Sequence, residues 1–119
     1  MVQNMIWTVI VNDSPYGSEK PWNALRLCAT AASEGIDVKL FLMGDSVVSG
    51  KKGQKTPNGY YNMEKMLGVL IKMGVVVKVC RSCLKARGLD ISELVEGVEL
   101  GSMEILVDWI KVSDKVITY

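Results

Sequence analysis

Apolar and polar positions alternate along the chain in blocks that predict strands separated by helices. Met5–Val11 (MIWTVIV), Ile36–Met43 (IDVKLFLM) and Val75–Val79 are short runs rich in apolar residues. Continuous apolar runs of this length are typical of strands buried on both faces of a parallel sheet. Lys115–Tyr119 (KVITY) is predicted to be a closing strand, and a further short strand is expected near Val98.

Between these runs, apolar residues recur at the spacing of a helix, which predicts helices over Ser18–Glu34, Gly59–Met73, Ser82–Ala86 and Ser102–Val112. The residues expected to face inward are Trp22, Leu25, Ala29 and Ala32 in the first, Tyr60, Met63, Met66, Leu67, Leu70 and Ile71 in the second, and Met103, Leu106, Val107 and Ile110 in the last. Strands that alternate with helices in this way indicate an α/β sandwich around a parallel sheet.

Three polar segments follow predicted strands and are therefore expected at one edge of the sheet. They are Asn12–Ser18, the loop Gly44–Asn58 and Cys80–Arg87. In open α/β sheets, functional sites form outside the carboxyl ends of the strands. The cysteines at positions 80 and 83 thus fall where a site is expected.

Composition narrows the class of protein further. The 119 residues are enough for a single domain, 1–119, and 49% are hydrophobic. The net charge of +1 provides no overall field for nucleic acid or a membrane, so neither is expected as a direct partner. The first apolar run is too short for a signal peptide or a transmembrane helix. We therefore expect a cytoplasmic protein, in which cysteines are kept reduced.

The sequence contains no histidine, which excludes Ser-His-Asp and Cys-His catalysis and every zinc site that uses histidine. A structural zinc site needs four ligands, and the chain offers one CxxC pair and Cys28. Cys28 is expected to be a buried small residue within a helix. No metal within the single chain and no cofactor are expected.

The segment Gly50–Thr56 (GKKGQKT) is similar to a phosphate-binding loop at first sight. Its glycines do not have the required spacing, and Pro57 follows it where a helix should begin. A solvated flexible or anion-attracting loop is the favoured interpretation.

Cys80 and Cys83 lie between a predicted strand and a predicted helix, close to Arg81, Lys85 and Arg87. Helix N-termini and nearby cations lower the pKa of a thiol and stabilise the thiolate. This pattern predicts a reactive cysteine, with the three cations stabilising an anion. The alternative is that two small residues simply fill the corner between strand and helix.

Other polar residues are expected at the same edge. Asp13 and Tyr16, in the first of the three segments, could line the cleft, although turn-forming roles in the segment NDSPYGS are favoured for them. A thioredoxin-like exchanger is unsupported, because Pro15, Pro21 and Pro57 all precede the CxxC pair.

Four segments resemble the DsrE/DsrF-like family, which includes the TusD-related sulfur-relay proteins. They are DSPYGSE (Asp13–Glu19), MGDSVV (Met43–Val48), VKVCRSCLKARGL (Val77–Leu89) and VEGVELGSM (Val95–Met103). The resemblance implies a three-layer α/β/α fold with a mostly parallel, five-stranded sheet. It also implies trimers or hexamers of identical or related subunits, and a persulfide carried by a cysteine at the position of Cys80.

Several functions remain open at this point. In the first, Cys80 takes sulfur from a donor protein and passes it to the thiol of an acceptor protein. Cys83 could instead attack the Cys80 persulfide, which releases sulfide and leaves a disulfide. The other candidates are a non-catalytic oligomeric binding module and a thiol-redox protein that uses the Cys80/Cys83 pair.

Overall fold

Five parallel strands form one sheet in the order β4-β3-β2-β1-β5 in the computed structural model, which describes residues 4–119. Their bounds are β1 (Ile6–Val11), β2 (Asp37–Leu42), β3 (Val76–Cys80), β4 (Glu99–Gly101) and β5 (Lys115–Thr118). Every neighbouring pair is parallel. The predicted strands and the α/β class are confirmed. The first three residues, which belong to the predicted domain 1–119, lie outside the described residues.

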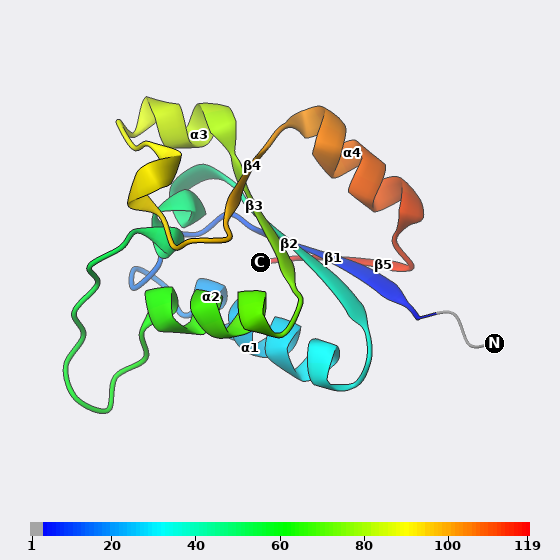
Figure 1. The fold of residues 1–119 in the computed structure, drawn as a ribbon, viewed down its shortest axis with the longest axis horizontal. Coiled ribbons are helices and arrows are strands. Elements are labelled where there is room, and N and C mark those ends of the chain that lie inside the picture. Colours follow the sequence, from blue (N-terminus) through cyan, green and yellow to red (C-terminus); the bar gives the residue numbers. More distant parts are fainter. Residues whose placement is uncertain (1–3) are drawn as a thin grey trace.

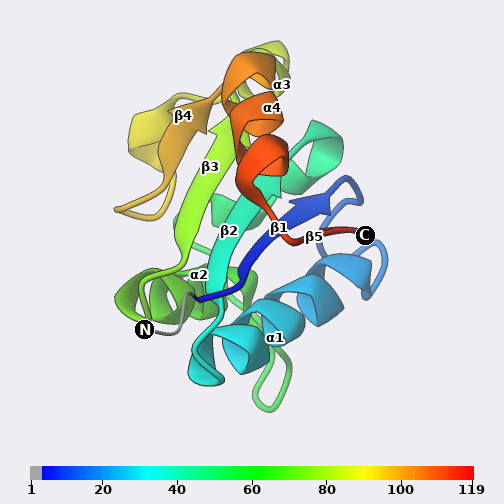
Figure 2. The same ribbon diagram turned by 90° about the vertical axis from the view of Figure 1, so that its right-hand side faces the viewer.

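The helices lie on both faces of this sheet and make three layers. α1 (Lys20–Ser33) and α2 (Met63–Lys72) cover one face, and α4 (Met103–Val112) lies on the other (Figures 1 and 2). The short helix α3 (Arg81–Ala86) follows β3 directly at the carboxyl edge. Two 3₁₀ segments complete the structure, η1 (Gly44–Gly50) and η2 (Ile91–Glu93).

Strand register decides which side chains face which layer. Lys78 of β3 lies beside Phe41 of β2, and Cys80 lies beside Gly101 of β4. Side chains alternate between the two faces of a strand, so Cys80 faces the same layer as Phe41. Phe41 packs edge-on against Trp109 of α4, with ring centroids 5.7 Å apart. Cys80 therefore opens toward the α4 side of the sheet.

The face of α4 that meets the sheet differs from the prediction. Leu106 is buried as expected and Trp109 is buried beside it, but Met103, Val107 and Ile110 are exposed by 53%, 48% and 40%. α4 carries apolar residues around much of its circumference, so spacing alone does not select one side. The side with Trp109 buries the largest ring, and it packs on the sheet.

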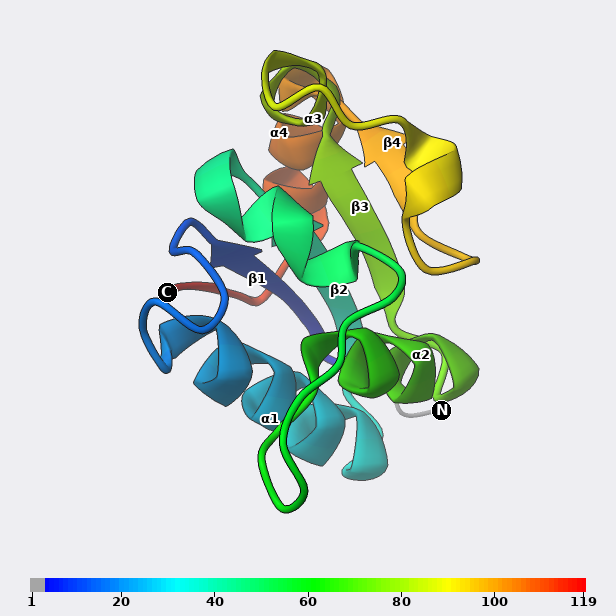
Figure 3. The ribbon, with the colours of Figure 1, turned by 90° about the vertical axis from the view of Figure 1, so that its left-hand side faces the viewer.

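The predicted loop Gly44–Asn58 begins with an ordered helical segment, η1 (Figure 3). Ser46 explains the order, because its buried hydroxyl donates to the carbonyls of Val11 and Met43, each at 2.7 Å. This side chain ties the segment to the ends of β1 and β2. The prediction of an irregular loop was wrong for Gly44–Gly50, which is helical.

α2 is shorter than predicted and starts at Met63 rather than near Gly59. Asn62 ends the preceding segment, and its side chain accepts a hydrogen bond from the Lys65 amide, so it caps the helix. Tyr60 therefore lies before the helix and is 51% exposed, and its predicted place on the apolar face of α2 was wrong.

The close approach of β4 to Phe41 gives a test of the packing around the site. A Cβ at Gly101 would lie 2.7 Å from Phe41 Cε2 and 3.2 Å from Lys78 Cβ. Gly101→Ala should therefore lower the free energy of unfolding by about 1–3 kcal/mol, because Phe41 is held by Trp109 and cannot move freely. Denaturant unfolding measures the loss.

Gly68→Ala is the matched control, since a Cβ there meets no atom within 4 Å inside α2. It should stabilise the protein by about 0.5–1 kcal/mol, because alanine favours the helix interior. If the two substitutions changed the free energy of unfolding equally, the result would contradict the close approach at Gly101.

Candidate functional site

Cys80 is at once the last residue of β3 and the N-cap of α3. The chain turns from strand to helix directly after it, so the amide of Cys83 points back and donates to Cys80 Sγ at 3.4 Å. The Cys80 side chain is largely buried, with 8% exposure. The predicted placement of this cysteine at a strand's carboxyl end and a helix's start is what the structure has.

Two side chains approach the Cys80 sulfur. The Cys83 thiol donates a hydrogen bond to Cys80 Sγ, with the two sulfur atoms 2.6 Å apart and both cysteines free. The Ser82 hydroxyl lies 3.4 Å from the same sulfur. Cys80 Sγ is thus surrounded by groups that can donate hydrogen bonds to an anion.

The surroundings give the two thiols different proton affinities. Burial acts to raise the pKa of Cys80, but hydrogen bonds from the Cys83 thiol, the Ser82 hydroxyl and the amides of both residues outweigh it and hold the pKa below its ordinary value. Burial and the hydrogen bond to Cys80 raise the pKa of Cys83. Cys80 therefore ionises first, and Cys83 keeps its proton.

Cys28 behaves quite differently from this pair. It is fully buried in α1, and burial raises the pKa of its thiol to about 12. A neutral thiol in an apolar environment is a poor nucleophile. The predicted reading of Cys28 as a small core residue fits this environment.

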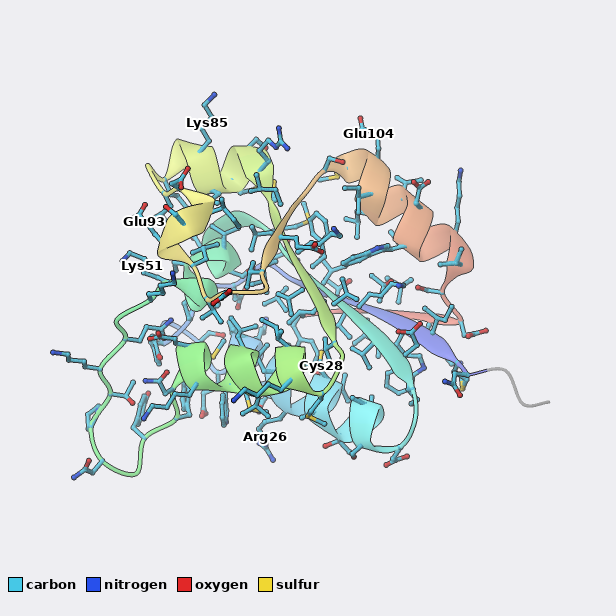
Figure 4. All side chains as sticks on the ribbon, viewed as in Figure 1. Arg26, Cys28, Lys51, Lys85, Glu93 and Glu104 are labelled. Atoms are coloured by element: carbon cyan, nitrogen blue, oxygen red, sulfur yellow. The ribbon has the colours of Figure 1, made fainter. Side chains whose placement is uncertain are left out.

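Cys80 opens onto a shallow hollow of about 410 Å³ between the starts of α3 and α4. The α3 side is lined by Arg81, Ser82 and Lys85, and the α4 side by Gly101, Ser102, Met103 and Glu104. Arg81 and Lys85 are exposed, and Lys85 extends outward from the helix (Figure 4). The two cations thus stand at the rim of the hollow, where they could meet an incoming anion.

Arg87, the third predicted cation, is engaged in a clamp at the end of α3. Its guanidinium donates to Asp45 Oδ1 of η1 through Nη2 at 2.7 Å and Nε at 3.1 Å. Its Nη1 donates to the Cys83 carbonyl at 2.9 Å. Arg87 therefore lies beside Cys83 rather than Cys80, and its positive charge acts to lower the pKa of Cys83.

Asp13 and Tyr16 make their contacts elsewhere. Asp13 accepts a hydrogen bond from the Ser18 hydroxyl at 3.1 Å, which is a turn-forming role. The Tyr16 hydroxyl donates to Gln54 and accepts from the Met63 amide. Its ring stacks on Tyr61, with ring centroids 5.4 Å apart. These contacts tie Tyr16 to the start of α2, and its cleft-lining role stays a prediction.

The lysine-rich segment after η1 is held down at several points. The amides of Gly53 and Gln54 donate to the carboxylate of Glu64 in α2, and the Lys52 amide donates to the carbonyl of Glu93 in η2. These contacts fasten Gly50–Gln54 to its neighbours. The predicted flexible or anion-attracting character of Gly50–Thr56 stays a prediction.

Sequence reasoning overlooked Ser82, Gly44 and Asp45. Ser82 could have been noticed, because it lies in the first turn of the predicted helix, two residues after Cys80. Gly44 and Asp45 follow β2, and the Gly44 amide lowers the pKa of Cys83 by hydrogen bonding. Their contact with α3 depends on sheet order, which spacing along the chain does not reveal.

Two findings bear on other kinds of site. Among residues 4–119, no group of three or more cysteine and acidic side chains is arranged to hold a metal ion. Within the same residues, no helix is both long enough and apolar enough to cross a membrane.

A buried cysteine at the end of a strand, with a pKa held below its ordinary value, makes this a small α/β protein with a candidate thiol site. The model of the DsrE/DsrF-like family matches residues 5–119, and the chain belongs to this family. An uncharacterized protein of Methanopyrus kandleri is 46% identical over 112 residues, which cover 94% of this chain and 92% of that protein. Protein YchN of Escherichia coli is 40% identical and covers 93% of this chain and 96% of its own length.

Solved structures agree with this assignment. The crystal structure of the E. coli ychN protein matches with a TM-score of 0.89 over 98% of this chain and 100% of that one. A protein of unknown function from Methanobacterium thermoautotrophicum matches with a TM-score of 0.71 at 18% identity, and covers 98% of this chain and all of its own. The latter supports the fold alone. The predicted family and its three-layer fold are confirmed.

The hydrogen bond between the two thiols can be tested by removing its donor. Cys83→Ala should raise the pKa of Cys80, because the thiolate loses its side-chain donor while burial remains. The rate of Cys80 alkylation, followed against pH, should therefore reach its midpoint at higher pH. Cys83→Ser, which keeps a donor, should restore part of the shift, whereas an unchanged profile in Cys83→Ala would contradict the assignment.

Proposed function

We propose that the protein is a sulfur-relay protein, a single DsrE/DsrF-like domain that carries sulfur as a persulfide on Cys80. The observation that carries the proposal is the set of hydrogen bonds to Cys80 Sγ, which favours an anionic sulfur at this position. A thiolate is the nucleophile of sulfur transfer, and a persulfide is also anionic at neutral pH. Family membership supports the same role.

The transfer follows from ordinary thiol chemistry. The Cys80 thiolate attacks the outer sulfur of a donor persulfide; a bond forms between the two, the donor's S–S bond breaks, and the donor leaves as a thiolate. An acceptor thiolate then attacks the outer sulfur on Cys80 in the same manner, and Cys80 leaves as the thiolate. Arg81 and Lys85, at the rim of the hollow, would attract the anionic group that approaches.

A protonated Cys83 suits a carrier. Cys83 stays a donor at neutral pH because its pKa is raised by burial and by its hydrogen bond to Cys80. A neutral thiol attacks a persulfide slowly, so sulfur on Cys80 would persist until an acceptor arrives. Donor and acceptor are expected to be proteins that present a cysteine to the hollow, in the reducing cytoplasm.

The sulfur-relay proposal can be tested with a cysteine desulfurase and cysteine labelled in its sulfur. We expect one added sulfur atom on Cys80, located by intact mass and peptide mapping, and its loss in Cys80→Ala. Cys28→Ala is the matched control and should load normally, since Cys28 is fully buried. Label on Cys28, or no label on the folded protein, would contradict a carrier role for Cys80.

A thiol-redox role is the second candidate, and the 2.6 Å between the two sulfurs favours it. In that case the pair would cycle between dithiol and disulfide with a protein partner. The same desulfurase experiment separates the two roles, because a redox protein would yield the Cys80–Cys83 disulfide without retained sulfur.

We also propose that the subunits assemble, as a trimer or hexamer of this chain or with related subunits. The support is the apolar stripe of Met103, Val107 and Ile110 on the outer side of α4, each at least 40% exposed. Exposed apolar residues on one side of a helix are typical of subunit surfaces. A non-catalytic oligomeric binding module would use the same surface.

A charge on this stripe should break the assembly. Val107→Asp is expected to yield smaller particles in light scattering coupled to gel filtration, because a carboxylate would be buried without a partner. Val69→Asp is the matched control, since Val69 is equally exposed, at 47%, but lies on α2 in the opposite layer. If Val69→Asp dissociated the assembly and Val107→Asp did not, the interface would lie on α2, which would contradict the proposal.

A further inference from the structure

Arg87 makes three hydrogen bonds that join the end of α3 to η1. Two go to the Asp45 carboxylate and one goes to the carbonyl of Cys83. The guanidinium thus lies between an anion that neutralises it and the residue that shares a hydrogen bond with Cys80. Neither Arg87 nor Asp45 lines the hollow onto which Cys80 opens.

The Asp45–Arg87 ion pair adds little to stability. The side chain of Asp45 is 66% exposed and that of Arg87 is 32% exposed, and ion pairs this close to solvent are weak. The pair holds the positive charge of Arg87 beside Cys83. The groups that act directly on Cys83 are Cys80, the Gly44 amide of η1 and Arg87 of its own helix, and Asp45 reaches it only through Arg87.

Cys83 is close enough to destroy a persulfide on Cys80. If Cys83 loses its proton, its thiolate can attack Cys80 Sγ, and a Cys80–Cys83 bond forms. The bond between Cys80 Sγ and the outer sulfur breaks, and the outer sulfur leaves with the electron pair as hydrosulfide. The persulfide is the oxidant in this step, and no further reagent is needed.

We propose that Asp45 and Arg87 are a positioning pair that sets how readily Cys83 attacks Cys80, and so decides whether sulfur on Cys80 waits for an acceptor or leaves as sulfide. The statement about sulfur rests on the proposed relay function. The pair acts through Cys83, because the clamp holds the charge of Arg87 beside that residue while Asp45 offsets it.

The two partners should have opposite effects. Asp45→Asn keeps an oxygen for the guanidinium but removes the offsetting charge, so Arg87 then favours the Cys83 thiolate more strongly. Arg87→Gln removes the cation and disfavours that thiolate. The double variant restores the charge balance and should return toward the parent. A purely structural pair predicts instead that both single variants change the rate in the same direction.

The persulfide experiment uses the full chain, loaded on Cys80 with inorganic polysulfide and freed of excess reagent. Sulfide and the Cys80–Cys83 disulfide should appear in equal amounts, severalfold faster in Asp45→Asn and severalfold slower in Arg87→Gln. The pH at which sulfide release becomes fast should be lower in Asp45→Asn and higher in Arg87→Gln than in the parent protein. Arg26→Gln is the matched control; this arginine extends from α1, and its side chain bonds Asn23 (Figure 4).

A second arm needs no persulfide. Glutathione disulfide converts Cys80 into a mixed disulfide and releases one glutathione. The Cys83 thiolate then attacks Cys80 Sγ, displaces the second glutathione as a thiolate and forms the same internal disulfide. Internal disulfide formation should be faster in Asp45→Asn and slower in Arg87→Gln, in the same order as sulfide release. Cys83→Ser should stop both sulfide release and internal disulfide formation.

The two arms separate the two proposals. If the glutathione arm has the expected order but polysulfide leaves no sulfur on Cys80, the relay function is overturned while the control of Cys83 stands. If the two single variants shift the glutathione arm in the same direction, or do not shift it, the positioning role is overturned whatever the persulfide does.

Discussion

The hydrogen bond from the Cys83 thiol to the Cys80 sulfur is the contact on which the proposed chemistry depends. It exists because the chain changes from strand to helix directly after Cys80. In a continued strand, residues three apart would be separated by about 10 Å. In a helix, residues three apart are neighbours on one face. The end of β3 therefore creates the thiol pair and supplies the amide that supports it.

Residues on both sides of β3 pack around this junction between strand and helix. On the β4 side, Gly101 lies next to Cys80 and leaves room for Phe41, which α4 covers through Trp109. On the β2 side, η1 brings Asp45 under α3, where Arg87 reaches it. A parallel sheet makes this possible, because the carboxyl ends of β2, β3 and β4 meet at one edge. Residues far apart in the sequence thus converge on one pair of sulfurs.

Much of this arrangement could be predicted from the sequence. Apolar runs located the strands, and the position of CxxC after Val75–Val79 placed the candidate site at the carboxyl edge of the sheet. The positions of the three cations were harder to predict, because Arg81, Lys85 and Arg87 all lie close to the cysteines along the chain. The structure places Arg81 and Lys85 at the rim of the hollow and Arg87 on Asp45. Such a difference depends on the neighbouring strand and cannot be derived from local spacing.

The errors have two physical origins. The inward side of α4 and the order within η1 were decided by tertiary contacts, whereas the late start of α2 follows from a local helix cap. Trp109 packs its side of α4 on the sheet, and the Ser46 hydroxyl holds η1 on the end of β1. The Asn62 cap determines where α2 begins. Helical periodicity is a weak guide where apolar residues surround a helix.

The proposed chemistry requires that the proton between the two thiols rests on Cys83, so that Cys80 is the anionic sulfur. A pH titration of thiolate ultraviolet absorbance, taken as the difference between the parent protein and Cys80→Ala, measures this directly. Cys80 should ionise below the ordinary pKa of a cysteine and before either other cysteine in the chain. Ionisation of Cys80 at or above that ordinary value, or after Cys83, would contradict the proposed chemistry.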